Sequence, residues 1–209
     1  MSERVFTTEF LLQATGRQQS MAIDGGSDEA LAERVRASGD RAAFSLLVSR
    51  YRGRIVALAR RMLAAQSADE AEDVAQETFL AAYEKRNSYG RGQPFRPWLY
   101  RIAVNRCLDR LRAESRRPAP LHWDSLPEPM AATEADPLDA LLADEGERHL
   151  ATAVAALPPK LRAVFLLRHL DALSYDEIGE VTGVPVSTVK THLFRARVLL
   201  RTALAEYLD

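Results

Sequence analysis

The chain has 209 residues, a formal net charge of −1 at pH 7, 47% hydrophobic residues and 27% charged residues. These values fit a globular protein of one or two small domains, and no apolar run reaches the roughly 20 residues that a membrane helix needs. The single cysteine, Cys107, excludes an internal disulfide, and the four histidines form no zinc pattern with it. Because the segment Val5–Leu12 is too short and polar for a signal peptide, we expect a cytoplasmic protein without membrane insertion, metal or cofactor.

The first half of the chain is predicted to be helical. Asp28–Ser38 has the length and composition of a short helix, and a longer helix is expected from Asp40 to about Ala65. A third helix is expected from about Ala68 to Arg86. In the helix predicted from Asp40 to about Ala65, apolar residues recur at spacings of three and four: Phe44, Leu47, Tyr51, Ile55, Leu58 and Met62.

A loop and a fourth helix complete this half. Glycine and polar residues in Asn87–Pro94 favour a loop. Pro97 suits the first turn of a helix because its fixed φ is already helical, and that helix is expected to continue to about Arg116. No segment alternates with period two, so the sequence predicts no sheet.

Five prolines and many acidic residues interrupt the pattern between Pro118 and Pro137, which excludes one continuous helix there. Helices resume at Leu138–Ala156 and Lys160–Leu170. We therefore predict an all-α protein in which residues 118–140 form a flexible, acidic, Pro-rich linker between two small helical domains, 27–117 and 141–209. Residues 1–26 are an N-terminal extension without a specific pattern, either a frayed, disordered tail or a helix that needs a partner.

Charge is strongly segregated along the chain. Residues 66–84 hold six acidic residues and no basic one, whereas residues 85–117 hold ten basic residues against two acidic ones. Residues 118–147 hold eight acidic residues and no basic one, and residues 187–201 hold four lysines or arginines and no acid. Any single run is readily explained as a solvated face, but two basic zones separated by an acidic one favour two nucleic-acid-binding surfaces on a tether.

The stretch LSYDEIGEVTGVPVSTVKTHLFRARVLLR, residues 173–201, predicts a helix-turn-helix. Ser174 and Glu177 have the spacing of a capping box, and Gly183 stands where a left-handed residue ends a helix. Pro185 prevents simple continuation of that helix. In the next helix Val189, Leu193, Ala196 and Leu200 share one face, while short polar residues and cations occupy the other, as in a helix that enters the major groove. A helical hairpin with a solvated face is the alternative.

Several motifs in a fixed order resemble one family. The stretch 173–201 looks like the C-terminal helix-turn-helix of bacterial sigma factors of the extracytoplasmic-function group (ECF, group 4). DRAAFSLLVSRYRGRIVALARRM, AEDVAQETFLAAYEK and FRPWLYRIAVNRCLDRLR resemble the N-terminal domain of the same family, and ALPPKLRAVFLLRHLDALS resembles the lead-in to its second domain. The resemblance covers roughly residues 28–204 apart from the linker.

The resemblance implies a protein that binds core RNA polymerase and directs it to promoter DNA. The N-terminal domain would read the −10 element, partly as a flipped base held by the loop Asn87–Pro94, where glycines let the backbone approach the base and Tyr89 offers a stacking surface. Asn105 would contact a base edge, and the arginines would mainly contact phosphates. The candidate −10 residues are Tyr89, Arg91, Arg101, Asn105, Arg106 and Arg110. Trp98 is expected in the core rather than as a wedge between strands.

The resemblance also assigns the other surfaces. The C-terminal helix-turn-helix would read the −35 element through Ser187, Thr188, Lys190, Thr191, Phe194, Arg195 and Arg197. The third helix would dock on the largest polymerase subunit through Asp73, Gln76, Glu77 and Phe79, since an acidic surface suits a protein better than DNA. A helix whose acids gather near its positive end is the plainer explanation. The family is commonly held inactive by an anti-sigma factor, so such a partner is expected.

The acidic linker has two readings: it occupies a basic channel of the polymerase until RNA displaces it, or it is a soluble tether. Because it offers little apolar surface, we expect the two domains to move independently and the free chain to bind promoter DNA weakly. A transcriptional repressor or activator with the same helix-turn-helix is the alternative function, but it would leave the acidic helix and WLYRIAVN unexplained. No nucleophile–base spacing or phosphate loop indicates an enzyme. Cys107 is expected to be a small buried residue.

Overall fold

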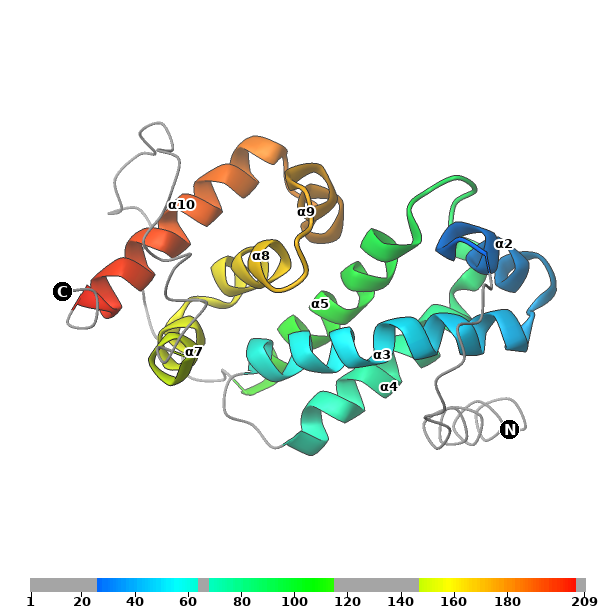
Figure 1. Ribbon diagram of the computed structural model, residues 1–209, viewed down its shortest axis with the longest axis horizontal. Coiled ribbons are helices and arrows are strands. Elements are labelled where there is room, and N and C mark those ends of the chain that lie inside the picture. The colour runs from blue at the N-terminus through cyan, green and yellow to red at the C-terminus, as the bar shows by residue number, and fades with distance from the viewer. Residues whose placement is uncertain (1–25, 64–67, 115–146, 206–209) are drawn as a thin grey trace.

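The computed structural model describes residues 26–63, 68–114 and 147–205, and within these ranges every regular element is a helix (Figure 1). The N-terminal domain consists of α2 (Asp28–Ser38), α3 (Arg41–Leu63), α4 (Ala68–Glu84), a 3₁₀ turn η1 (Arg86–Ser88) and α5 (Phe95–Glu114). The C-terminal domain consists of α7 (Glu147–Ala156), α8 (Pro159–His169), α9 (Tyr175–Thr182) and α10 (Val186–Ala203). The all-helical prediction is confirmed. Residues 1–25 of the predicted extension and the linker lie outside the described residues.

Helix ends differ from the predictions by a few residues. α5 begins at Phe95, two residues before Pro97, which keeps the proline within the first turn as expected. The third helix ends at Glu84, and the chain then tightens into η1 before the loop. A helix is predicted over residues 138–156, and the structure describes its second part, Glu147–Ala156, as α7.

Local side-chain bonds fix the start of the N-terminal domain. The Ser27 hydroxyl accepts a hydrogen bond from Ala30 N and caps α2, which ends at Gly39 with a left-handed φ of 66°. The carboxylate of Asp40 then accepts bonds from the first amides of α3, Ala42 N and Ala43 N, each at 3.0 Å. These amide bonds, with a second contribution from Arg34, lower the pKa of Asp40, so the cap is charged at neutral pH.

Helix α3 is the centre of the N-terminal domain, with α2, α4 and α5 packed around it. Its apolar stripe includes Leu47, Ile55, Leu58 and Met62, all 0–1% exposed. Aromatic rings fill the space between helices at both ends. Phe44 contacts the rings of Phe79 and Tyr83 near α4, and Tyr51 contacts those of Phe95 and Tyr100 in α5.

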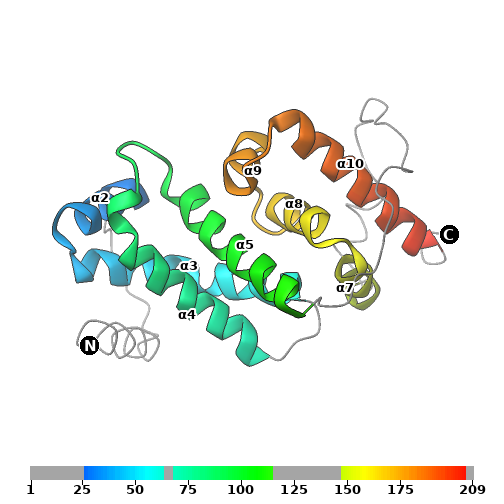
Figure 2. The ribbon, with the colours of Figure 1, turned by 180° about the vertical axis from the view of Figure 1, so that it is seen from behind.

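In the C-terminal domain α9 and α10 pack against α8, and α7 packs against α10 (Figure 2). The core positions of α8 run almost continuously from Leu161 to Leu167. They meet the apolar face of α10, where Val189, Leu193, Ala196 and Leu200 are buried as predicted. Arg162 is the charged member of this core and is 6% exposed.

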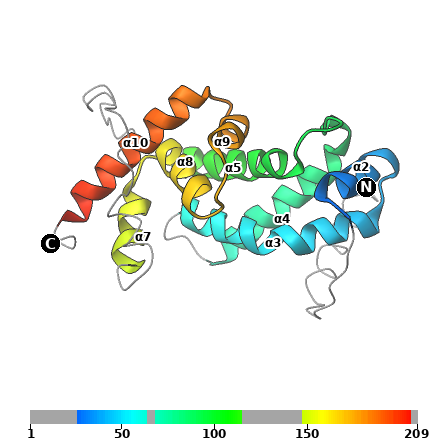
Figure 3. The same ribbon diagram turned by 45° about the horizontal axis from the view of Figure 1, so that its top comes forward.

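The two domains pack against each other, which differs from the expected independent motion. α5 packs against α9, and the C-terminal part of the molecule also contacts α3 through α7 and α8 (Figure 3). One continuous cluster of buried side chains extends through both domains. The expectation was drawn from the linker alone. The surfaces that make the contact belong to the domains themselves, where Tyr100 of α5 is fully buried and Asp171 is 8% exposed.

Candidate nucleic-acid and polymerase interfaces

The helix-turn-helix is built by local bonds that the sequence indicates. The Ser174 hydroxyl accepts a bond from Glu177 N at 3.2 Å, and the Glu177 carboxylate accepts one from Ser174 N at 2.7 Å, so the predicted capping box is confirmed. α9 ends at Gly183, whose φ is 72°. Pro185 directly precedes α10, where it has no amide hydrogen to leave unpaired.

Gly179 has a role in this motif that the sequence reasoning missed. A Cβ at this position would lie 3.0 Å from the carbonyl oxygen of Val184 and 3.9 Å from the Val186 side chain. The missing side chain therefore lets the turn fold back closely onto α9. The available signal was a glycine in the middle of a predicted helix, since glycine is disfavoured there unless another part of the chain approaches.

The polar face of α10 is presented at its N-terminal half. Ser187 and Lys190 are exposed. The other candidate −35 residues are half-buried: Thr188, Thr191, Phe194, Arg195 and Arg197.

Two side chains on this face are already oriented. The ammonium of Lys190 lies 5.9 Å from the centre of the Tyr175 ring, and the Thr191 hydroxyl donates to the Ser187 carbonyl at 3.0 Å.

His192 lies on the same helix, and burial, together with the charges of Arg195 and Lys160, lowers its pKa. It is therefore neutral at pH 7, and the positive charge of this face comes from lysine and arginine.

A second polar and basic surface lies on α5 in the other domain. Arg101, Asn105 and Arg106 are exposed. Arg110 is half-buried and its guanidinium donates to the Glu77 carboxylate at 2.7 Å. Arg101, Asn105 and Arg106 are therefore accessible to a ligand, whereas Arg110 forms an ion pair with the acidic helix α4.

The loop between η1 and α5 holds Tyr89 inside the protein. Tyr89 is 4% exposed, its ring contacts Phe95 and Trp98, and its hydroxyl donates to the Gln93 carbonyl. Burial, aided by nearby carboxylates, raises its pKa to about 12. In this arrangement the ring supports the loop from beneath and is not available to stack on a base. Trp98 is half-buried in the same cluster, in agreement with the core interpretation.

On the outer side of this loop, residues 91–94 are exposed to solvent. Arg91 has an 81% exposed side chain and an ion pair of 3.3 Å with Glu33. Gly92 has a left-handed φ of 74°, which only glycine adopts easily. Gln93 is exposed, and its side chain lies against Gly90, where a Cβ would approach it to 2.8 Å. The left-handed φ explains the glycine at position 92, whereas the atoms near Gly90 belong to the end of the Gln93 side chain, and the approach of a base to these glycines stays a prediction.

The acidic surface on α4 includes three of the four candidate docking residues. Asp73 and Gln76 are exposed and Glu77 is half-buried. Phe79, by contrast, is 2% exposed and packs edge-on against Phe44. The structure therefore gives Phe79 a place in the core, from which it can support the surface but not contact a partner.

The remaining chemistry of the described residues is limited. Cys107 is fully buried in α5, and burial raises the pKa of its thiol to about 12, so it is an unreactive core residue as expected. Among residues 26–63, 68–114 and 147–205, no group of histidine, cysteine and acidic residues is placed to hold a metal ion. None of the helices in these ranges has the length and apolar character required to cross a membrane.

Comparison with known proteins matches both domains. The sigma-70 region 2 family matches residues 47–117, and the sigma-70 region 4 family matches residues 148–200. The ECF RNA polymerase sigma-E factor of Haemophilus influenzae is 37% identical over 182 residues, which cover 83% of this chain and 93% of that protein.

Solved structures give the same result. CnrH, in complex with the cytosolic domain of CnrY, is 30% identical, with a TM-score of 0.63 and coverage of 86% of this chain and 97% of that chain. The sigma factor RpoE of Bartonella quintana, in complex with the anti-sigma factor NepR, is 23% identical, with a TM-score of 0.58 and coverage of 78% and 96%. At 23% identity, the similarity to RpoE concerns the fold alone.

Proposed function

This chain belongs to the ECF RNA polymerase sigma factors, and we propose that it binds core RNA polymerase and directs promoter-specific initiation by reading a −10 and a −35 element. One observation carries the proposal. The chain bears a polar, basic helix surface in each domain, on α5 and on α10, together with an acidic surface on α4. Two DNA-facing surfaces and one protein-facing surface are what a promoter-specificity subunit needs. Because polymerase and DNA are its partners, we place it in the cytoplasm.

The N-terminal half of α10 is proposed to read the −35 element in the major groove. Lys190 has donors for guanine, and Ser187 and Thr191 offer short polar groups that let the helix approach closely. Arg195 is proposed as a further base contact, whereas Arg197, half-buried along the helix, suits a phosphate contact that positions it. The Tyr175 ring beneath Lys190 restricts that side chain, so less entropy is lost when it binds.

The −10 element is proposed to meet α5 and the loop before it. Asn105 is exposed on α5, and an amide can bond two atoms of a base edge. Arg101 and Arg106 are exposed nearby and suit phosphates. In the loop, Arg91 and Gln93 are the exposed side chains, and the buried Tyr89 ring holds the loop in shape.

Core polymerase is proposed to bind the exposed residues of α4, chiefly Asp73 and Gln76 with Glu77 beside them. The ion pair between Glu77 and Arg110 joins this surface to the DNA-facing helix α5, so polymerase binding and −10 recognition would share one rigid support. An anti-sigma factor is the expected inhibitor, as the resemblance implies, and RpoE of Bartonella quintana, which shares this fold, is solved in complex with the anti-sigma factor NepR.

Run-off transcription with purified core polymerase tests the proposal. We expect specific initiation only when the chain is added. Thr191→Ala should weaken use of a −35 element by about 1–3 kcal/mol if the hydroxyl contacts a base. Thr202→Ala is the matched control, because its hydroxyl also donates to the carbonyl four residues earlier, at 3.1 Å, but at the far end of α10. Specific DNA binding without any stimulation of polymerase would instead support a repressor or activator.

Two further variants separate the remaining surfaces. Asp73→Ala should weaken binding to core polymerase, whereas Glu84→Ala, an exposed acid at the end of the same helix, should not. Exchange of residues 87–94 for the loop of a related factor should change the preferred −10 sequence while polymerase binding persists. Unchanged promoter preference after the exchange would show that the loop is not the reader.

A further inference from the structure

Three polar side chains join the two domains at one place. Asp171 lies in the turn between α8 and α9, and its carboxylate accepts a hydrogen bond of 2.5 Å from the hydroxyl of Tyr100 in α5. The guanidinium of Arg96, one turn earlier in α5, donates to the backbone carbonyl of Asp171 and lies 5.7 Å from the centre of the Tyr100 ring. A second bond from the C-terminal domain runs from Arg162 to the carbonyl of Met62 in α3, at 2.5 Å.

The chemistry of this contact is unusual for a permanent interface. Tyr100 is fully buried and Asp171 is 8% exposed, so a carboxyl group has been taken out of water. Its second oxygen, Oδ2, has no hydrogen-bond partner among the described residues. Buried polar groups that are incompletely bonded favour separation of the surfaces, because water would satisfy them. The next residue, Ala172, has a φ of 51°, which residues other than glycine rarely adopt.

The closed arrangement conflicts with promoter recognition. Elements centred near −10 and −35 are about 25 base pairs apart, which corresponds to roughly 85 Å at 3.4 Å per base pair. In the closed chain α9 packs directly on α5, and α10 begins immediately after the turn that follows α9. The start of α10 is therefore only about one or two helix diameters from α5, on the order of 10–20 Å. The chain cannot place both surfaces on their elements without separating the domains.

We infer that Tyr100, Asp171 and Arg96 form a latch that holds the free chain closed, and that binding to core polymerase opens it. The inference rests on the proposed function, since only a reader of two distant elements must separate its domains. Opening also separates α7 and α8 from α3 and breaks the bond from Arg162 to the Met62 carbonyl, so the latch acts together with these contacts. Opening exposes the carboxylate of Asp171 to water, which offsets part of the lost contact.

Energy transfer between two dyes measures the latch directly. The dyes are attached to cysteines introduced at the exposed positions Arg60 in α3 and Ala151 in α7, two helices that pack against each other across the domain contact, in a background in which the buried Cys107 is changed to Ala. The free chain should show high transfer efficiency, which should fall when core polymerase is added. Tyr100→Phe keeps the ring but removes the hydroxyl, and should raise the ratio of open to closed chain about tenfold or more.

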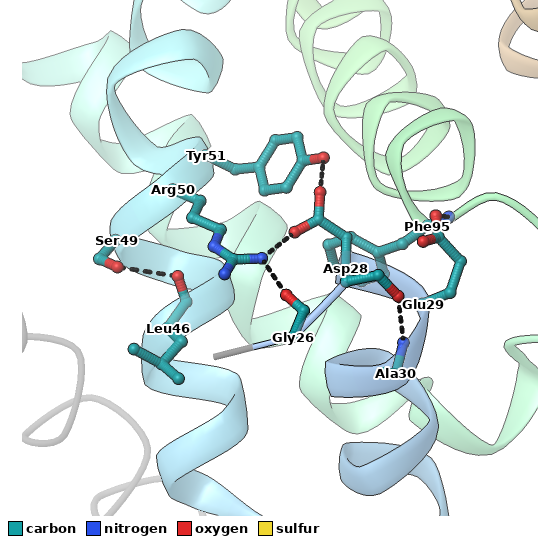
Figure 4. A network of polar contacts seen from close by, with 10 residues as sticks. Gly26, Asp28, Glu29, Ala30, Leu46, Ser49, Arg50, Tyr51 and Phe95 are labelled. Atoms are coloured by element: carbon teal, nitrogen blue, oxygen red, sulfur yellow. Dashed lines mark hydrogen bonds and ion pairs between the residues drawn. The ribbon is translucent and has the colours of Figure 1, made fainter. Parts of the chain in front are cut away.

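A second pair of the same chemistry provides the matched control. The hydroxyl of Tyr51 donates to the carboxylate of Asp28, which also accepts a bond of 2.6 Å from Arg50, and all three residues lie in the N-terminal domain (Figure 4). Tyr51→Phe should therefore leave the transfer efficiency of the free chain unchanged. Helicity measured on the same samples shows whether each variant retains its domains.

Substitutions at the other side of the latch keep the test independent of α5. Asp171→Ala removes the acceptor and should open the free chain, whereas Asp171→Asn keeps an oxygen that can accept the Tyr100 bond and should leave it closed. Low transfer efficiency in the unmodified free chain, or unchanged efficiency in both Tyr100→Phe and Asp171→Ala, would overturn the latch. Run-off transcription by the unmodified chain tests the proposed function separately, because initiation does not depend on how the free chain is held.

Discussion

The two halves of this molecule hold their helices in place by different means. In the N-terminal domain, side chains bond from one helix to another: Arg50 pairs with Asp28 at 2.6 Å, and Arg52 pairs with Glu72 at 2.8 Å. In the C-terminal domain, the geometry of α9 and α10 comes from local bonds, above all the capping box at Ser174. The first domain is therefore a rigid support fixed by long-range contacts. The second has a locally determined motif whose position depends on the surface against which it packs.

The largest effect on stability is expected from a substitution in the core of the N-terminal domain. Phe79→Ala removes a ring that is 2% exposed and packs against Phe44, and should lower the free energy of unfolding by about 3–5 kcal/mol. Gln76→Ala, exposed on the same helix, should change it by less than about 0.5 kcal/mol. Urea unfolding followed by circular dichroism measures both. If Phe79→Ala proved neutral for stability but weakened polymerase binding, the docking role suggested by the sequence would be restored.

The next variant tests how the C-terminal domain depends on its neighbour. The guanidinium of Arg162 donates to three backbone carbonyls, those of Met62, Ala155 and Leu157, at the ends of α3 and α7. Arg162→Met should cost about 3 kcal/mol of unfolding free energy, because charged hydrogen bonds are lost and buried carbonyls are left unpaired. Lys160→Met, at an exposed position of the same helix, is the control. Equal stability of the two variants would contradict this account of Arg162.

A smaller effect is expected at the local cap. Ser174→Ala removes one half of the capping box and should destabilise α9 by about 1 kcal/mol. Because α9 also packs on α5, amide exchange should rise in both helices. Faster exchange confined to α9 would show that the two domains are less coupled than the packing indicates. Ser38→Ala, whose hydroxyl bonds Arg34 O at the end of α2, is a control in the other domain.

The smallest effect concerns pH. Burial raises the pKa of Asp171, although the Tyr100 bond and the charges of Arg96, Arg54 and Arg61 act in the opposite direction. A carboxyl group whose pKa is higher in the closed chain than in the open one favours closure below its ordinary pKa of about 3.9, and this contribution is lost as pH rises through the raised value. Energy transfer in the free chain should therefore increase on acidification from neutral pH. The same titration of Asp171→Asn should be flat, and an equal slope in that variant would assign the effect to another group.

The sequence predicted what depends on neighbouring residues. Helical periodicity identified the core faces of α3 and α10, and the spacing of Ser174, Glu177 and Gly183 identified the helix-turn-helix, because these signals lie within a few residues. A residue's role within a motif was harder to predict. Phe79 and Tyr89 were expected on surfaces and lie in the core. A motif gives the order of residues but not which side of a helix or loop the rest of the chain will cover.

The contact between the domains could not be predicted. Tyr100 and Asp171 are 71 positions apart, and nothing in either local pattern indicates the other. Linker composition favoured independent domains because it describes only the tether. The proposed DNA and polymerase residues that remain exposed, among them Lys190, Asn105 and Asp73, stay predictions until their variants are measured.

The central claim is that this chain reads two distant DNA elements, and does so only after polymerase separates its domains. Footprinting on promoter DNA with and without core polymerase tests it most directly. We predict weak, unspecific protection by the free chain, and simultaneous protection of the −10 and −35 elements when core polymerase is present. Tight, specific protection of both elements by the free chain would contradict the account.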